Sequence, residues 1–392
     1  MKKILVNDKY FYWVLGVSAA VIPLPGNNFS SISIILLLIV WMFYQSFSAK
    51  GKSLKENIWD FSIMILPFVL VLLGLLYTDN PKEGIKKVQL CLPFFVYPLI
   101  LFSTKLDNKA SPFVLYCFSF GTFIASLIGI IYALSYRFMG LGDYFFNEKF
   151  SELLDKHTTY FSLFVVISML FILSESIKRR LNWKISIPVL LYFIGILYIV
   201  STRISLVALS ASIIILVFME IKSKLKWLGI IIPFFLIGLF SMPNFQKRFE
   251  PSDTEIGQIS DLEFRKYHWL SVWETLQENP IIFGNGTGAS RDFLYETYKK
   301  HQLTSAYELE YNAHNQYLEY ALDFGLLGVV VLGIILVYII IRFYRSGNYL
   351  ALAVIFTFII YFLTESLLQR HDGIVTFSLL MSLFLTSRKI RT

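Results

Sequence analysis

The sequence predicts an all-α integral membrane protein with about twelve membrane-spanning helices and one large extracytoplasmic loop that contains short helices. The first observation behind this fold class is composition: of 392 residues, 56% are hydrophobic, 17% are aromatic and 16% are charged, and the mean hydropathy is +0.62. The second is a series of apolar runs of membrane-spanning length, separated by short polar connections. The third is one long polar connection, residues 242–313. Together these features are typical of a polytopic membrane protein.

The apolar runs define the predicted helices, which have to cross a hydrocarbon core of about 30 Å. Residues 185–219 need separate treatment, because a single helix over that range would be roughly 50 Å long. We therefore expect two helices there, with Arg203 of the sequence Ser201-Thr202-Arg203 at the tip of a hairpin. The predicted runs are 10–25, 29–47, 58–77, 84–103, 111–136, 157–176, 185–201, 203–219, 225–241, 315–341, 348–364 and 373–387.

These runs divide the chain into three parts. Residues 1–241 are expected to hold transmembrane helices 1–9, residues 242–313 form the extracytoplasmic loop, and residues 314–392 hold helices 10–12. A connection of that length is too long to be only a link, and long loops commonly carry function. We therefore expect the chemistry on the side of the membrane that this loop occupies.

The distribution of charge predicts the orientation. Alternate connections on one side, together with both termini, contain 20 of the 35 Lys and Arg residues but only six of the 27 acidic residues. By the positive-inside rule, both termini are cytoplasmic. The long loop, all five histidines and Arg203 then lie on the outer side.

Several classes of function are excluded by the same features. The net charge of +8 does not indicate nucleic-acid binding, because the basic residues form short clusters between apolar runs. Cys91 and Cys117 both lie inside apolar runs, so neither a disulfide framework nor a metal site is predicted. The first outer loop, residues 23–28, contains no acidic residue, and no other Asp/Glu/His cluster has metal-ligand spacing. We expect a metal-independent mechanism without a cofactor.

One histidine stands where the long polar segment runs into an apolar helix. His314 begins the sequence His-Asn-Gln-Tyr-Leu, and the apolar pattern continues to Ile341. The unpaired N–H groups and the positive end of the helix dipole disfavour a charged imidazole at this position. A neutral histidine can accept a proton near pH 7. The alternative is an interfacial histidine that only caps the helix.

The long loop contains two predicted helices with a glycine-rich turn between them. Residues 261–278 form the first, ended by Asn279-Pro280, and Arg265, Trp269, Val272 and Leu276 share a face predicted to pack. Residues 283–288 lack the features of a phosphate-binding loop and are interpreted as a tight turn, with Gly286 a candidate ligand contact. Residues 289–301 are expected to form an amphipathic helix at the membrane surface.

Two arginines are candidate binding residues for a diphosphate. Arg203 and Arg265 stay charged at any relevant pH and offer a planar fork of donors. The alternative for Arg265 is a side chain that lies along an apolar surface with its head in solvent. Glu365 and Arg370 are interpreted mainly as an ion pair that ties two helix ends together. Further candidates that could line a substrate path are His157, Tyr160, His268, Asn315, Tyr317, Gly286 and Arg370.

The arrangement of these motifs resembles that of the O-antigen ligase and O-antigen polymerase superfamily of bacterial envelope glycosyltransferases. The resemblance rests on the motif from His314 to Leu318, followed by Gly325 and Gly328. It also rests on Ser201-Thr202-Arg203, where the threonine departs from the commonest form, and on the loop residues Arg265, Trp273, Asn279, Pro280, Gly284 and Gly286. The helix layout with its large loop matches as well, which implies a GT-C-like fold in the bacterial cytoplasmic (inner) membrane.

The resemblance implies transfer of a glycan from undecaprenyl diphosphate to an acceptor hydroxyl outside the cytoplasmic membrane, with inversion at the anomeric carbon. A ligase of lipopolysaccharide biosynthesis uses the lipid A core as acceptor, whereas a polymerase uses another lipid-linked repeat unit. His314 would be the base, and Arg203 and Arg265 would bind the diphosphate. We favour the ligase. A flippase of lipid-linked oligosaccharides is the alternative from another class, although the apolar runs carry few ionisable groups and show no repeat.

Overall fold

The computed structural model describes residues 7–107, 109–220, 238, 261–278 and 280–387, without the side chains of residues 27 and 261–265. Every predicted apolar run within that range contains helix, whereas run 225–241 lies outside it except for residue 238. The main helices are α1 (Asp8–Ala20), α2 (Asn27–Phe43), α3 (Phe47–Glu56), α4 (Ile58–Gly74), α5 (Pro81–Cys91), α6 (Pro93–Phe102), α7 (Ala110–Phe138), α9 (Thr158–Ile177), α10 (Trp183–Val200), α11 (Arg203–Glu220), α14 (Asp261–Glu278), α15 (Ser290–Lys300), α17 (Gln316–Ser346), α18 (Tyr349–Phe362) and α19 (His371–Thr386). Short elements are α8 (Glu148–Glu152), α16 (Thr304–Glu308) and the 3-10 turn η1 (Leu367–Gln369).

The all-helical, multi-pass character of the prediction is confirmed for the described residues. Six helices are long and apolar enough to cross a membrane, or seven if α2 and α3, which meet at a bend of 110°, count as one span. Three shorter apolar helices, α4, α18 and α19, accompany them. The number of twelve spans stays a prediction.

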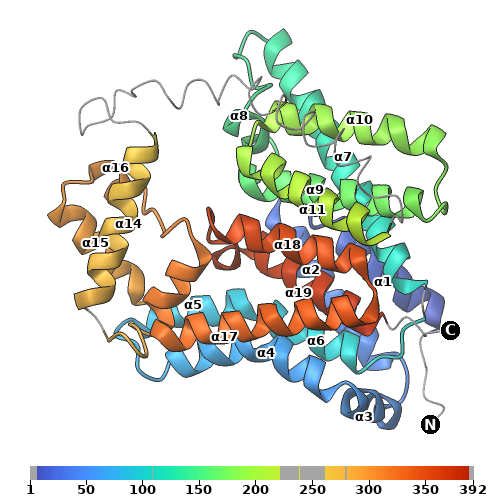
Figure 1. Ribbon diagram of the computed structural model, residues 1–392, viewed down its shortest axis with the longest axis horizontal. Helices are drawn as coiled ribbons and strands as arrows, with labels where there is room; N and C mark the ends of the chain where they lie inside the picture. The colour runs from blue at the N-terminus through green and yellow to red at the C-terminus, as the bar shows by residue number, and fades with distance from the viewer. Residues whose placement is uncertain (1–6, 108, 221–237, 239–260, 279, 388–392) are drawn as a thin grey trace.

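The predicted break in residues 185–219 is confirmed. Helix α10 ends at Val200, Ser201 adopts a left-handed conformation with φ of 52°, and α11 begins at Arg203. Both helices pack against α9, and α11 also packs along α18. Helix α9 is the centre of the bundle, because nearly all its side chains are buried among neighbouring helices. Figure 1 shows α14, α15 and α16 together at one end of the bundle, beside the start of α17.

A glycine-rich wedge, residues 280–288, joins the helices α14 and α15 to the bundle. The tight turn was predicted at 283–288, and the structure has turns at 281–285 and 287–289. The wedge enters a kink of α17 at Gly325, whose φ of 61° and ψ of −152° are not helical. Beyond the kink, the amides of Leu326 and Leu327 donate to the carbonyls of Ile281 and Ile282 at 2.8 and 3.1 Å. The wedge therefore supplies hydrogen-bond acceptors that the kinked helix does not.

Replacing Gly325 by alanine is expected to destabilise this junction strongly. An added Cβ would lie 2.5 Å from the backbone oxygens of Ile281 and Ile282, and the left-handed φ disfavours any side chain. Together the strain and overlap should cost about 3 kcal/mol. We expect a lower yield of folded protein and a lower Tm in detergent. The control is Gly333→Ala, also in α17, where a Cβ meets nothing within 4 Å. A Tm for Gly325→Ala equal to that of the control would contradict the assignment.

Candidate active site

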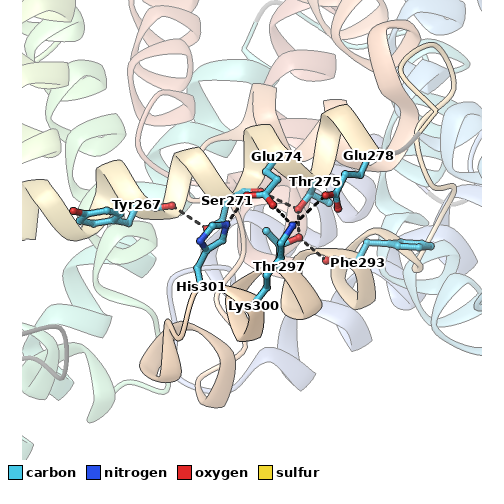
Figure 2. Close-up of polar contacts among 9 residues, drawn as sticks. All are labelled: Tyr267, Ser271, Glu274, Thr275, Glu278, Phe293, Thr297, Lys300 and His301. Carbon is cyan, nitrogen blue, oxygen red and sulfur yellow. Dashed lines mark hydrogen bonds and ion pairs between the residues drawn. The ribbon is translucent and has the colours of Figure 1, made fainter.

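A polar clamp holds the helices α14 and α15 together next to the site. Glu274 of α14 accepts from Lys300 at 2.5 Å and also pairs with His301, and the hydroxyls of Thr275 and Thr297 lie 2.9 Å apart. Figure 2 shows these contacts between the two helices, with Ser271 and then Tyr267 on the two preceding turns of α14. The clamp fixes which face of α14 turns inward.

The predicted packing face of α14 is confirmed at Val272, which is buried, and at Leu276, which packs against the same cluster, but not at Trp269. His268, Ser271, Val272 and Thr275 are buried, whereas Trp269 is 40% exposed. The prediction grouped apolar side chains, whereas the inward face also contains His268 and Thr275, whose partners lie on α15. Arg265 lies one turn before His268 in the same helix. Its side chain is outside the described residues, so its role stays a prediction.

His268 connects this helix pair to the predicted base. Its ring stacks on the ring of Tyr298 of α15, with centroids 4.9 Å apart. The ring of His314 is also a neighbour, with its centroid 5.5 Å from that of His268. Burial raises the pKa of Tyr298 well above its ordinary value, so that its hydroxyl stays protonated. Because His268 is buried in this aromatic group, it supports the position of the His314 ring and offers little surface to a substrate.

The backbone around His314 is held in a fixed and uncommon conformation. His314 has φ of 43°, in the left-handed region, and its amide donates to the side chain of Asn312 at 2.9 Å. Asn315 then caps α17, accepting from the amides of Tyr317 and Leu318 at 2.9 and 3.1 Å. The amide group of Asn315 also donates to the carbonyl of Leu363 at 3.1 Å. The start of α17 is therefore tied to the end of α18.

The imidazole of His314 faces a buried carboxylate that follows α18. His314 Nδ1 lies 3.6 Å from Glu365 Oε2, and the side chains are 26% and 6% exposed, respectively. Burial alone would raise the pKa of Glu365, but His314, with His157 and Arg370, lowers it below its ordinary value. Glu365 is thus a carboxylate at neutral pH. We predicted an ion pair between Glu365 and Arg370 that ties two helix ends together. Glu365 instead faces the imidazole of His314, and the side chain of Arg370 is exposed.

His157 is brought to the same place by the start of α9. His157 is the residue before Thr158. Burial lowers its pKa below the ordinary value; the charge of Glu365 opposes this shift, whereas those of Arg370 and His314 add to it. Its buried Nδ1 has no hydrogen-bond partner within the described part of the chain. His157 is therefore neutral at pH 7 and has capacity for a further hydrogen bond.

Three other predicted lining residues have packing roles. Tyr160 is fully buried, and its hydroxyl donates to the carbonyl of Ser366 at 3.2 Å, which ties α9 to the turn before η1. Gly286 is buried in the wedge, where a Cβ would lie 2.7 Å from the carbonyl oxygen of Gly74. Tyr317 is half-buried and packs its ring against Phe362. None of these contacts requires a substrate.

Arg203 lies at the same end of the bundle as Glu365. Helices α11 and α18 pack closely, and the hydroxyls of Ser212 and Thr357 lie 2.8 Å apart. Towards the start of α11, Ser205 comes within hydrogen-bonding reach of Tyr361, at the end of α18. Since Arg203 begins α11 and Glu365 follows α18, the fold brings both to the end where His314 lies.

A buried network behind His314 was not predicted. Asp323 of α17 accepts from Lys87 of α5 at 2.5 Å, from Ser290 of α15 at 2.5 Å and from Gln369 at 3.1 Å. One turn earlier, Glu319 accepts from the amide of Ala313 at 3.0 Å. Two carboxylates four residues apart on an apolar helix are the sequence signal that could have indicated such a network. It fixes α17 against α5, α15 and η1.

Comparison with known protein families gives a match to part of the chain. Residues 187–333 match a family described as O-antigen ligase. No curated protein matches the chain. The matched segment begins in α10 and ends in α17, so it contains Arg203, Arg265 and His314. Within the described residues no group of three or more His, Cys, Asp or Glu side chains is arranged to hold a metal ion.

Proposed function

From the O-antigen ligase domain that residues 187–333 carry, we propose that this membrane protein is a glycosyltransferase of the ligase type. It would transfer a glycan from undecaprenyl diphosphate to a hydroxyl of the lipid A core, on the outer side of the bacterial inner membrane. The observation that carries the proposal is the placement of His314, a partly exposed imidazole whose Nδ1 faces the buried carboxylate of Glu365.

The geometry supports a role for His314 as general base. A carboxylate at Nδ1 favours the tautomer with the proton on that nitrogen, which leaves Nε2 able to accept a proton. In the reaction, Nε2 takes the proton of the acceptor hydroxyl as its oxygen forms a bond to the anomeric carbon. Glu365 then stabilises the imidazolium that results. Distances longer than a normal hydrogen bond are common before substrate binds.

The leaving group determines what else the site requires. As the acceptor oxygen attacks, the bond between the anomeric carbon and the diphosphate oxygen breaks, and undecaprenyl diphosphate leaves with the electron pair. Attack from the face opposite the leaving group inverts the anomeric configuration. Arg203 and Arg265 are proposed to bind the diphosphate and stabilise its developing charge, without a metal ion. His157, with its free Nδ1, and the exposed Arg370 are proposed to contact the glycan.

Reconstitution of the full chain in proteoliposomes tests this proposal. Purified undecaprenyl-diphosphate-linked glycan is offered with lipid A core, and the products are separated by gel electrophoresis. Glycan attached to the core supports the ligase. Longer chains on the lipid carrier without core modification would identify a repeat-unit polymerase of the same superfamily. Movement of unchanged donor across the bilayer without either product would identify a flippase and contradict the proposal.

Replacing Arg203 by glutamine is expected to lower kcat/KM by about 10²-fold, because one charged donor to the leaving diphosphate is lost. Arg203→Lys should recover only part of the activity, since an ammonium group lacks the planar fork. The initial rate at several donor concentrations measures both effects. The control is Arg137→Gln, which removes an exposed basic residue at the end of α7. Equal rates for Arg203→Gln and this control would exclude Arg203 from diphosphate binding.

A further inference from the structure

The two long extracytoplasmic helices expose opposite kinds of surface. Helix α15 buries Leu294 and Tyr298 towards α14 and exposes charged side chains, namely Asp292, Glu296, Lys299 and Lys300. It therefore does not present the apolar face that was predicted to lie on the membrane. Helix α14 buries its polar face against α15 and exposes Trp269, Leu270 and Trp273, which are 40%, 51% and 58% accessible. The pair thus has a charged side and an aromatic side.

The aromatic side continues into the wedge. Ile281, Ile282 and Phe283 are 66%, 60% and 55% exposed. Six large apolar side chains of α14 and the wedge that follows it are therefore exposed, and we call them the apolar strip: Trp269, Leu270, Trp273, Ile281, Ile282 and Phe283. Between residues 266 and 277, the other exposed residues on this face of α14 are Lys266 and Gln277. An apolar surface of this extent requires a covering environment.

The wedge also fixes the level of the strip relative to the membrane. Ile281 and Ile282 accept hydrogen bonds from α17 just beyond its kink. From that point α17 exposes one continuous apolar face, formed by Leu326, Val330, Ile334, Val337 and Ile341. Spacings of three and four residues place these side chains on the same face, which in a membrane-spanning helix meets lipid. The strip begins where this lipid-facing surface ends.

We propose that the apolar strip is a membrane anchor, which seats the extracytoplasmic helices on the outer leaflet. The aliphatic and phenyl groups of the wedge enter the acyl boundary. Trp269 and Trp273 lie at the headgroup level that tryptophan favours, and Lys266 reaches the lipid phosphates. A bare sugar-stacking platform would not need the aliphatic residues Leu270, Ile281 and Ile282. The charged side of α15 faces water.

Site-directed spin labelling of the full chain in nanodiscs of phosphatidylethanolamine and phosphatidylglycerol tests the anchor. In a Cys91→Ser/Cys117→Ser background, single labels are attached through Leu270→Cys, Ile281→Cys and, as control, Glu296→Cys. Labels at 270 and 281 should collide with oxygen and be shielded from a water-soluble nickel chelate, whereas the label at 296 should show the reverse. No donor is added, so the result does not depend on the proposed function.

Other outcomes would overturn the anchor. Nickel accessibility at 270 equal to that at 296 would place the strip in water. Shielding at 270 from both reagents would indicate a protein partner, and shielding only after free glycan is added would indicate a sugar platform. If the cysteine-free protein does not fold, brominated lipids replace the labels: they should quench wild-type tryptophan fluorescence more than that of Trp269→Phe/Trp273→Phe. Equal fractional quenching of the two proteins would also reject the anchor.

Discussion

Replacing His314 by alanine is expected to abolish glycan transfer in the reconstituted assay. The proposed base takes the proton of the acceptor hydroxyl, and general base catalysis contributes about 10²–10⁴-fold to a rate. The loss should fall on kcat, because the donor is held by its diphosphate at other residues. Binding of the lipid-linked donor should therefore stay close to that of the wild type. Transfer is measured as the initial rate and donor binding as the retention of labelled donor, both on the same preparation.

The control for this variant is another histidine, outside the proposed site. His301→Ala removes an imidazole that pairs with Glu274 in the clamp between α14 and α15, and the remaining contact to Lys300 preserves that clamp. We expect it to retain most of the activity. His314→Gln, which keeps hydrogen-bonding capacity but is not a base at neutral pH, should be as inactive as His314→Ala. Substantial activity of His314→Gln would mean that the imidazole only positions the helix start.

Replacing Glu365 by alanine should reduce kcat by about 10²-fold or more and leave KM for the donor nearly unchanged. The pKa of Glu365 lies below its ordinary value, so the group is charged throughout the neutral range. Its removal deprives the imidazolium of the carboxylate that stabilises it and fixes the tautomer. Glu365→Gln should show a similar loss, because the amide has nearly the same shape but no charge.

Chemical rescue separates this positioning role from a merely structural one. Glu365 is buried, and its truncation to alanine leaves a space of carboxylate size beside His314. Added formate should restore part of kcat in Glu365→Ala and have no effect on His314→Ala. If Glu365→Ala loses folded protein in proportion to activity and formate restores nothing, the assigned role of Glu365 is wrong.

The position of the helices was largely predictable from the sequence. An apolar run long enough to span a bilayer has few alternatives to a helix, because lipid offers no partners for the backbone. The break at Ser201-Thr202 was predictable for the same reason, since one unbroken helix would exceed the bilayer thickness. Run 84–103 was predicted as one span, and α5 and α6 together form one apolar helix of membrane-spanning length, Pro81–Phe102, with only a local break at Leu92 before Pro93.

The contacts of the site were less predictable, because they join residues far apart in the sequence. His314 could be selected from its place at a helix start, but its pairing with Glu365 depends on how α18 packs beside α17. The same holds for Asp323 and Lys87, which are 236 positions apart. The inward face of α14 was predicted at Val272 and Leu276 but missed at His268 and Thr275, because these hydroxyl and imidazole side chains gain partners only when α15 is in place.

The most direct test of the central assignment is a gel of surface glycolipids from a strain that lacks this chain, complemented with wild type or with His314→Ala. Wild type should restore the ladder of bands above the lipid A core. With His314→Ala, every band above the core should be missing and long glycan should accumulate on the lipid carrier, although the protein reaches the membrane in normal amount. A wild-type ladder in the His314→Ala strain would contradict the account, because transfer would then proceed without the proposed base.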